Sequence, residues 1–463
     1  MIDKNYEEKE LDILRNAIDK ASNIMGKKLV QSDEIKNIIN ILEKFLRTNK
    51  TLCYGGTAIN NILPEQDRFY NKDIEIPDYD FFSPNPIYCA KKLVDIYYAN
   101  GYLEVEAKSG VHEGTYKVFV NFIPIADITF LDKKLFYNLL KRSIKINAIN
   151  YCPANFLRMA MYQELSRPMG DVSRWEKILK RSILLNKNYP LTGTKCSDND
   201  FMRDYTDNKD NHFKIFSIVR QSFINQGLVF FGGYAASLYS KYMPYYERKL
   251  INNMPDFDIL AEEPYTACII VKEQLEHEGI NNIKILKKPP IGEYISEHYE
   301  ICINKDTIAF IYKPNACHSY NIINISKQQI KVATIDTMLS FYLIFIYADT
   351  DYYDENRILC MSEYLFKVQL RNRLKQKGLL KRFSITCYGK QKSLEEIKSE
   401  KGKILKKLKD NIITKDSKLY INNFFKYNPN TNPYTKTKTK KNNKTKKNNK
   451  TKKNNKTKKN NKY

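Results

Sequence analysis

The amino-acid sequence predicts an α/β fold with mixed, α+β-type sheets, built from two tandem copies of one unit. Three observations lead to this prediction. Segments that contain Gly-Gly and Asp-x-Asp recur in the same order, and apolar residues switch between helical and strand spacing along the chain. The C-terminal end consists almost entirely of Lys, Asn and Thr, so helical additions and a disordered basic tail are expected around the two copies.

The first third of the chain alternates between helical and strand patterns. Residues 6–47 place apolar side chains such as Leu11, Leu14 and Ile18 three or four positions apart, which is typical of helices. A strand is expected at 51–54, followed by Gly55-Gly56 and a helix from about Thr57. Further strands are expected at 79–82, 102–107, 116–122 and 125–130, and a helix should begin near Pro153.

Three pairs of matching segments indicate that the unit is duplicated. YGGTAINNILP at 54–64 matches FGGYAASLYSKYMP at 231–244, and IPDYDFFSPNP at 76–86 matches MPDFDILAEEP at 254–264. The stretch 144–162 is similar to 330–347. Gly-to-Asp spacing is nearly equal, since Gly56 precedes Asp78 by 22 residues and Gly233 precedes Asp256 by 23.

These patterns divide the chain into five predicted regions. A helical segment comes first, then two copies of the unit, a basic and mainly helical region, and a Lys/Asn/Thr repeat tail. The regions are 1–49, 50–190, 191–350, 351–425 and 426–463.

The charge favours a polyanionic partner. Residues 436–462 hold 14 lysines, and removing them from the net charge of +25 leaves +11 on the rest of the chain. Nucleic acid fits this charge best and an anionic membrane next, whereas a generic solubility charge is the functionally neutral alternative. An expanded low-complexity run with little function is the corresponding alternative for the tail.

The cysteines and the apolar runs predict a soluble intracellular protein. No Cys-x-x-Cys pair occurs among the nine cysteines, which argues against a zinc module or a secreted disulfide framework and favours buried thiols. The N-terminus is charged, unlike a signal peptide, and the apolar run Met338–Ala348 is too short to span a bilayer. We expect no membrane contact and a cytoplasmic location.

Gly55, Gly56 and Thr57 form a candidate phosphate site. A strand that runs into Gly-Gly and then a helix leaves backbone N–H groups free at the positive end of the helix dipole. Glycine permits a close approach of the ligand. The alternative is a tight turn without a ligand.

Three aspartates form a candidate metal site. Asp78 and Asp80 are two residues apart on an expected strand, so both carboxylates face one side and Tyr79 faces the core. Asp127 lies in the apolar run IPIADITF, where an unpaired carboxylate is costly. A divalent cation such as magnesium would relieve the repulsion between the neighbouring carboxylates. The alternatives are a solvated surface pair for Asp78 and Asp80, and a hydrogen-bonded core aspartate for Asp127.

Gly-Gly-Thr, Asp-Tyr-Asp and a later lone Asp at these spacings resemble the polymerase β-like nucleotidyltransferase superfamily over residues 50–130. The block CPANFLRMAMYQELSRPMGDVSRWEKILKR at 152–181 is similar to the poly(A) polymerase catalytic subunits of large cytoplasmic DNA viruses, the poxviruses and the mimivirus group. The tandem duplication also resembles that family, so the two copies are expected to be nucleotidyltransferase-like domains.

The resemblance implies template-independent addition of AMP from ATP to RNA 3′ ends, with two Mg²⁺ or Mn²⁺ ions and release of pyrophosphate. Asp78 and Asp80 would hold both ions, and Asp127 would complete the site of the ion that activates the RNA 3′-OH. Gly55, Gly56 and Thr57 would hold the β and γ phosphates. A site of action in a virus factory or virion follows if the chain is viral.

Several downstream cations are candidate contacts for the triphosphate or the RNA, with exposed helix charges as the alternative: Arg158, Arg167, Arg174 and Lys177. Trp175 is the single tryptophan, and core packing is favoured over base stacking.

The second copy is expected to be inactive. It keeps Gly232, Gly233, Asp256 and Asp258, but alignment of IAFIY at 308–312 with IADIT places Phe310 at the position of Asp127. Asp306 lies four residues earlier, so this conclusion depends on the register. The copy would serve as a scaffold, an RNA platform or a dimer surface.

Alternative functions are CCA addition or small-molecule adenylylation, an Asp-x-Asp glycosyltransferase, and a non-catalytic RNA-binding subunit with two decayed copies. The expected partners are ATP and a single-stranded RNA 3′ end bound without sequence readout, because lysine repeats contact phosphates and tyrosines stack on bases. A homodimer is the default expectation for the oligomeric state.

Overall fold

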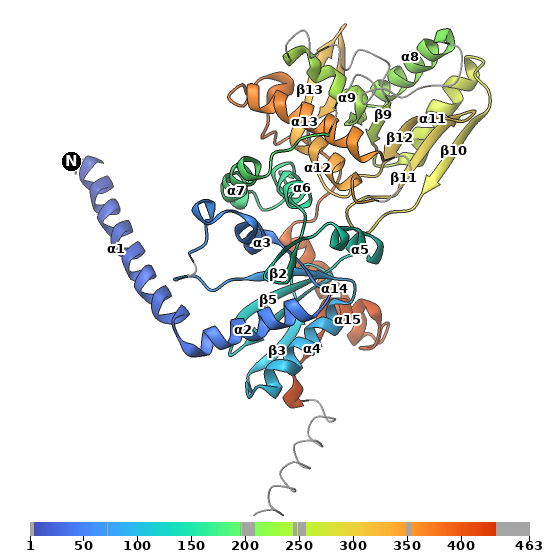
Figure 1. Ribbon diagram of the computed structural model, residues 1–463. Helices are drawn as coiled ribbons and strands as arrows, with labels where there is room; N and C mark the ends of the chain where they lie inside the picture. Colours follow the sequence, from blue (N-terminus) through green and yellow to red (C-terminus); the bar gives the residue numbers. More distant parts are fainter. Residues whose placement is uncertain are drawn as a thin grey trace, which may run out of the picture.

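A computed structural model of the chain describes residues 4–71, 73–194, 196, 209–243, 248, 256–348 and 353–431. The predicted tail at 426–463 lies outside these residues from position 432 onward. Within them the chain forms two mixed eight-stranded sheets, one in each copy of the unit, as the duplication predicted (Figure 1).

The first sheet holds both parallel and antiparallel neighbours. β1 is antiparallel to β2 and parallel to β7, while β5 is parallel to β2 and antiparallel to β4. Its order is β16 (Lys426–Tyr427), β3 (Val105–Ser109), β4 (Thr115–Val120), β5 (Ile123–Phe130), β2 (Tyr79–Ser83), β1 (Leu52–Tyr54), β7 (Ile149–Tyr151) and β6 (Ile144–Ile146). The expected strands are therefore present, although β3 begins three residues later than expected.

The second sheet repeats this topology over seven of its eight strands, and its eighth strand lies at the edge opposite to that of β16. The antiparallel pair β8–β9 corresponds to β1–β2, and the parallel pair β9–β12 corresponds to β2–β5. Its order is β10 (Ile283–Lys288), β11 (His298–Ile303), β12 (Asp306–Tyr312), β9 (Phe257–Leu260), β8 (Val229–Phe230), β14 (Gln328–Ala333), β13 (His318–Ile325) and β15 (Cys387–Tyr388). The shared order confirms the tandem duplication.

The helices cover the sheets in matching positions. Ser32 caps the N-terminus of α2, so the helical stretch at 6–47 is two helices, and α1 extends away from the body (Figure 1). In the first unit the helices are α1 (Lys4–Val30), α2 (Asp33–Thr48), α3 (Gly55–Ile62), α4 (Pro86–Ala99), α5 (Lys133–Lys141), α6 (Ala154–Leu165) and α7 (Trp175–Asn188). The later helices are α8 (Lys209–Asn225), α9 (Gly233–Tyr239), α11 (Pro264–His277), α12 (Ile335–Phe345), α13 (Glu355–Arg371), α14 (Leu394–Lys409) and α15 (Lys418–Phe424).

The two units meet through equivalent helices. α6 packs against α12, and both lie between the two sheets (Figure 1). α12 is buried along its whole length, which explains why its sequence is mainly apolar. Trp175 packs beside Phe383 with its indole N–H on the Glu164 carbonyl, in agreement with the packing role favoured above.

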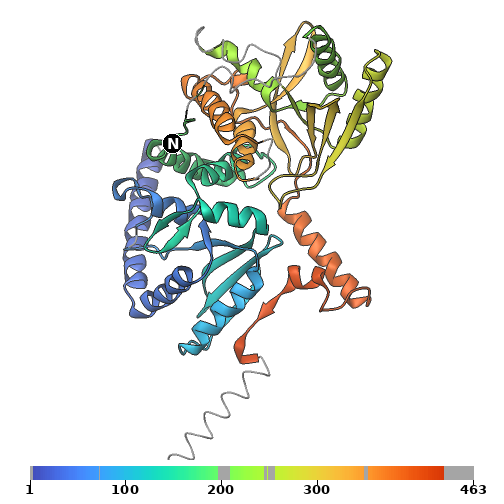
Figure 2. The same cartoon turned by 45° about the vertical axis from the view of Figure 1, so that its right-hand side comes forward.

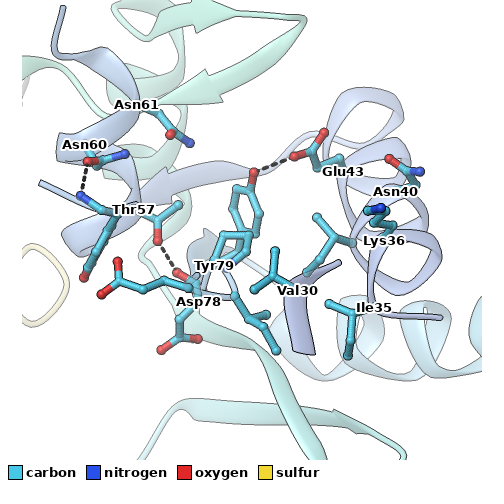
Figure 3. Close-up of a pocket in the computed structure, with 15 residues that line it drawn as sticks. Val30, Ile35, Lys36, Asn40, Glu43, Thr57, Asn60, Asn61, Asp78 and Tyr79 are labelled. Atoms are coloured by element: carbon cyan, nitrogen blue, oxygen red, sulfur yellow. Dashed lines mark hydrogen bonds between the residues drawn. The ribbon is translucent and has the colours of Figure 1, made fainter. Parts of the chain in front are cut away.

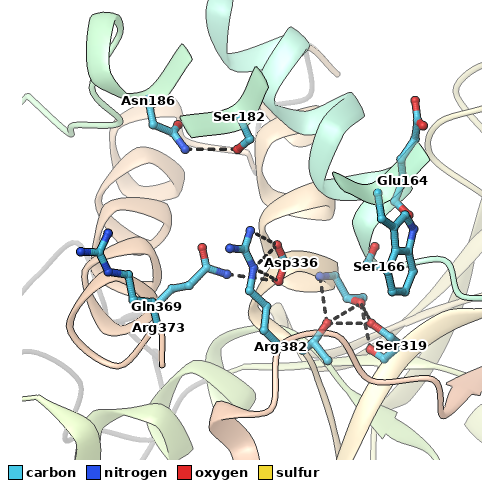
Figure 4. Close-up of polar contacts among 12 residues, drawn as sticks. Glu164, Ser166, Ser182, Asn186, Ser319, Asp336, Gln369, Arg373 and Arg382 are labelled. Carbon is cyan, nitrogen blue, oxygen red and sulfur yellow. Dashed lines mark hydrogen bonds and ion pairs between the residues drawn. The ribbon is translucent and has the colours of Figure 1, made fainter. Parts of the chain in front are cut away.

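The C-terminal segment crosses both units. A buried ion pair between Arg382 and Asp336 of α12, with Gln369 as a third partner, fixes its start (Figure 4). β15 then extends the second sheet, and β16 pairs with β3 at the edge of the first (Figure 2). The segment therefore belongs to both sheets.

The cysteine prediction is wrong for four of the nine residues. Cys196 is bonded to Cys360 and Cys317 to Cys387, so two disulfides link distant parts of the chain. The sequence did not indicate this because the partners are 164 and 70 residues apart. The other five are buried thiols, as expected. Among the described residues, no helix is long and apolar enough to cross a bilayer.

Candidate active site

Two parallel strands bring the three predicted aspartates to one part of the sheet. Asp80 of β2 is directly opposite Asp127 of β5, so their side chains lie on the same face. Asp78 lies two residues before Asp80, immediately before β2. Tyr79 points to the opposite side, where its hydroxyl donates to Glu43 of α2 at 2.9 Å. The alternation predicted from the sequence is therefore present.

The electrostatics of this group reflect like charges in a poorly hydrated place. Burial, and then the charges of Asp78 and Asp127, raise the pKa of Asp80 to about 7. Burial followed by the charge of Asp127 also raises the pKa of Asp78. Both shifts indicate negative charge that the surrounding protein does not fully neutralise.

Lys117 of β4 is a member of the group that the sequence reading did not select. It is the cross-strand neighbour of Asp127, and its Nζ lies 2.5 Å from Asp127 Oδ2. The sequence does mark Lys117, because it is the one charged residue of the strand TYKVFV. Its partner could not be predicted, because the partner depends on the register in which the strands pair.

The donor set fits divalent cations. In the part of the chain that the structure describes, no three acidic, histidine or cysteine side chains are already close enough together to hold a metal ion. Three carboxylates on one face, two of them with raised pKa, are nevertheless the hard oxygen ligands that magnesium or manganese prefers. Lys117 already supplies one positive charge at Asp127.

The Gly-Gly segment begins α3 beside these carboxylates. Gly55 has φ +73°, and a Cβ atom there would lie 2.4 Å from an Asp80 carboxylate oxygen, so no other residue fits without strain. A Cβ at Gly56 would lie 2.5 Å from the Tyr70 hydroxyl and 2.9 Å from Arg181 Nη1. The start of α3 thus faces aspartates on one side and a guanidinium on the other.

Thr57 has a different role from the one expected. Its side chain is buried, and its hydroxyl donates to the backbone carbonyl of Asp78 at 2.5 Å. The hydroxyl therefore positions the loop that carries Asp78, and only the backbone of Thr57 remains for a phosphate.

α7 supplies the cations of the site. Arg181 donates to the Tyr70 hydroxyl at 2.6 Å, and its guanidinium stacks 4.9 Å from the Phe69 ring centre. The charge of Arg181, followed by burial and Arg174, lowers the pKa of Lys177, so these cations are close together. Arg174 also pairs with Glu164 at 3.5 Å. The candidate contacts Lys177 and Arg174 thus lie near Arg181, a cation that the sequence reading did not select.

The prediction that Arg158 contacts the triphosphate or the RNA is wrong. The structure places its side chain in the core, fully buried, where it donates to Asn186 at 2.7 Å and also to Asn155 and the Tyr189 carbonyl. These contacts tie α6 to α7 and leave the guanidinium no access to a triphosphate. Arg167 is half-buried and donates to Asn315 of the second unit at 3.3 Å.

The comparisons with known proteins agree with this geometry. Residues 40–171 match the family model of the poly(A) polymerase catalytic subunit. The predicted catalytic subunit of Acanthamoeba polyphaga mimivirus is 33% identical over 188 residues, which are 40% of this chain and 31% of the relative. That of African swine fever virus (strain Badajoz 1971 Vero-adapted) is 30% identical over 172 residues, 36% of each chain.

The resemblance to viral poly(A) polymerase catalytic subunits inferred from the motifs is thereby confirmed for the first unit. This chain spans about a third of the length of each of these relatives. The fold extends the likeness further. The crystal structure of the Megavirus polyadenylate synthase superposes with a TM-score of 0.76 at 21% identity, covering 95% of this chain and 89% of that one.

The second unit shows where the family's aspartate pattern ends. Asp258 of β9 is directly opposite Phe310 of β12, as Asp80 is opposite Asp127, so the predicted register of Phe310 is confirmed. Asp256 is buried and pairs with Arg357 of α13 at 3.4 Å. A Cβ at Gly232 would lie 1.5 Å from an Asp258 carboxylate oxygen, so the glycine persists for packing. A phenyl ring and a guanidinium take the places of a ligand and a cation.

A cavity of about 680 Å³ lies behind the loop that carries Asp78 (Figure 3). α2 lines one wall with Ile35 and Ile39, and α3 lines another with Thr57, Asn60 and Asn61. Tyr79 reaches across it to Glu43 (Figure 3). The cavity is therefore on the α2 side of β2, opposite the face of Asp80 and Asp127.

Proposed function

We propose that this protein is a template-independent poly(A) polymerase that adds AMP from ATP to RNA 3′ ends and releases pyrophosphate. The observation that carries the proposal is the direct pairing of Asp80 with Asp127, with Asp78 adjacent, beside the glycine-lined start of α3. The family match over residues 40–171, which cover this site, supports the same reaction.

The residues divide the work between metal binding and phosphate binding. Asp78 and Asp80 would hold two divalent ions, and Asp127 would complete the site nearer the RNA 3′-OH. When bound, the ions supply charge neutralisation and a more acidic 3′-hydroxyl. The backbone N–H groups at Gly55, Gly56 and Thr57, together with Arg181 and Lys177, would bind the β and γ phosphates of ATP.

In the reaction itself, the 3′ oxygen forms a bond to the α-phosphorus of ATP. The bond between that phosphorus and the bridging oxygen to the β-phosphate breaks, and the electron pair leaves with pyrophosphate. The protein's part is to align these atoms and to neutralise the triphosphate, because phosphoryl transfer needs little covalent help from the protein.

RNA binding follows from the charge. The net charge of +25, and the exposed lysines of α14, support contacts to a phosphate backbone without sequence readout. The relatives come from large DNA viruses, which supports a site of action in the cytoplasmic virus factory or the virion.

A homodimer is proposed on the evidence of α1. This helix leaves Leu11, Leu14 and Ile18 about half exposed on one stripe. A second copy would cover the stripe, and removal of residues 1–30 should then convert a dimer to a monomer in light-scattering measurements. A monomeric full-length chain would contradict this assignment.

The test of the activity is direct. The protein is incubated with a short RNA, magnesium or manganese, and each of the four nucleoside triphosphates in turn. Extension of the RNA into oligo(A) ladders with ATP, and no extension with the other three nucleoside triphosphates, identifies the polymerase. Addition limited to CCA, transfer to a small molecule, or RNA binding without extension would each replace the proposal with the corresponding alternative.

A further inference from the structure

Lys117 and Asp127 form an ion pair inside the group of residues proposed to bind metal. The two residues are cross-strand neighbours on β4 and β5, with Nζ 2.5 Å from Oδ2. The Lys117 side chain is 37% exposed and that of Asp127 is 17% exposed, so the pair is partly shielded from water. An ammonium at this distance occupies one side of the carboxylate where a cation would bind.

Among the residues that the structure describes, neither Asp78 nor Asp80 forms an ion pair with a basic side chain. Asp80 lies opposite Asp127 and Asp78 lies two residues before Asp80, but of the three aspartates only Asp127 has a lysine ammonium at contact distance. The three aspartates therefore present two unequal places for a cation. One lies between Asp78 and Asp80, where the structure records no ammonium in contact, and the other lies at Asp127, where the Lys117 ammonium is already present.

The second unit lacks this arrangement. Glu300 of β11 and Phe310 of β12 stand opposite each other at the positions of Lys117 and Asp127. The lysine and the third carboxylate are thus replaced together in the copy that has lost the aspartate pattern. A lysine needed only for the stability of the sheet would have no reason to change with the carboxylate.

We propose that Lys117 is a positioning residue that competes with the metal ion at Asp127, so that the two ions of the active site bind with different affinities. The ion at Asp78 and Asp80 binds first. The ion at Asp127 binds only when it displaces the Lys117 ammonium. This inference rests on the proposed two-ion function and assigns a role that the motif residues alone do not contain.

Direct Mn²⁺ binding to the full chain, followed by electron paramagnetic resonance of the free ion without RNA or ATP, tests the proposal. Wild type should show one stronger and one weaker site. Lys117→Met should strengthen the weaker site roughly five- to tenfold, the effect of losing a partly exposed charge pair. Lys117→Arg keeps the charge and should bind Mn²⁺ as wild type does.

Lys108→Met is the matched control. Lys108 is the β3 neighbour of Lys117, but its ammonium pairs with Glu106 at 2.8 Å, away from the aspartates. Its removal should leave both Mn²⁺ affinities unchanged. Equal affinities for the weaker site in wild type and Lys117→Met, or weaker binding in Lys117→Met, would overturn the proposal, and thermal melting shows whether each variant is folded.

The outcome is separable from that of the proposed function. Mn²⁺ binding is measured without catalysis, so a chain that extends no RNA can still show the predicted change at Asp127. Conversely, a chain that makes oligo(A) but whose weaker Mn²⁺ site ignores Lys117 would refute only the role of Lys117.

Discussion

Single side chains distinguish the first unit from the second. Asp80 and Asp127 face each other across two parallel strands, whereas Asp258 faces Phe310 in the equivalent strands of the second unit. A phenyl ring offers no oxygen to a metal ion. We therefore expect all chemistry to take place in the first unit.

Replacement of the aspartates tests this expectation. Asp78→Asn or Asp127→Asn should lower the rate of RNA extension by at least about a thousandfold, because an amide neutralises a metal-binding carboxylate. The matched control is Asp256→Asn, which keeps an acceptor for Arg357 in the second unit and should leave the rate nearly unchanged. Equal losses in all three would show that the second unit takes part in catalysis.

The raised pKa of Asp80 predicts that the stability of the fold depends on pH. Its pKa is raised to about 7 in the fold by burial and by its acidic neighbours, against 3.8 as the ordinary value. Folding therefore favours the neutral form of the Asp80 carboxyl group. The contribution of this group to the stability of the fold is present below about pH 4 and is lost as the pH rises through 7. Asp80→Asn should accordingly raise the melting temperature of the metal-free protein at pH 8 and change it little at pH 4, measured by calorimetry.

Arg181 is expected to act on ATP binding. It lies at the start of α3, with Nη1 2.9 Å from the Cβ position of Gly56. Arg181→Met should raise the KM for ATP about tenfold or more, because a bidentate contact to phosphate is lost. Lys180→Met is the control, since the ammonium of Lys180 pairs with Glu176 on the exposed face of α7 and should leave the KM unchanged.

The sequence predicted the aspartates but not every cation around them. Asp78, Asp80 and Asp127 could be predicted because strand alternation and an apolar surrounding run constrain where a carboxylate can point. Arg181 could not be predicted from the sequence, because its place depends on how α7 lies over Gly56. Arg158 was misassigned because its apolar helix gives no sign that Asn155 and Asn186 would satisfy a buried guanidinium.

At the level of elements, the helix α12 depends on one buried ion pair. Asp336 is fully buried and accepts from Arg382 and Gln369 (Figure 4). Strand and helix positions around it were predictable from hydrophobic spacing. The ion pair was not, because Asp336 and Arg382 approach only after the C-terminal segment has returned to α12.

Breaking this pair should be costly. Asp336→Ala leaves the Arg382 guanidinium buried without its carboxylate and should lower the free energy of unfolding by about 3–5 kcal/mol. Chemical denaturation followed by circular dichroism measures the change. Glu176→Ala, which removes the exposed partner of Lys180, is the control and should have little effect. A similarly small effect of Asp336→Ala would show that the pair is not needed for stability.

For the whole molecule, the duplicated topology was predictable and the connections between units were not. Matching Gly-Gly and Asp-x-Asp segments indicated two equivalent sheets, which the strand order confirms. Sequence spacing says nothing about the packing of α6 on α12, or about the disulfides that join Cys196 to Cys360 and Cys317 to Cys387. The packing of α6 on α12 depends on the relative placement of the two units, whereas each disulfide depends on how distant segments of the second unit and the region after it approach each other.

The lysine tail is expected to contribute to RNA affinity across the molecule. Removal of residues 432–463, which contain the 14 lysines of 436–462, should weaken binding of a single-stranded RNA and reduce its dependence on salt. Fluorescence anisotropy between 50 and 200 mM salt, roughly the range in which such contacts weaken, measures both. Extension at low salt and saturating RNA should be retained. Identical salt slopes with and without the tail would indicate that it does not contact RNA.

The pairing of β16 with β3 has a consequence for biosynthesis. The edge strand that completes the first sheet is Lys426–Tyr427, more than 300 residues after its neighbour Val105–Ser109. During translation the first sheet keeps that edge uncovered until Lys426 and Tyr427 have left the ribosome. The first sheet is thus completed only after the second sheet has been synthesised, and premature termination between β3 and β16 would leave the first sheet without its edge strand.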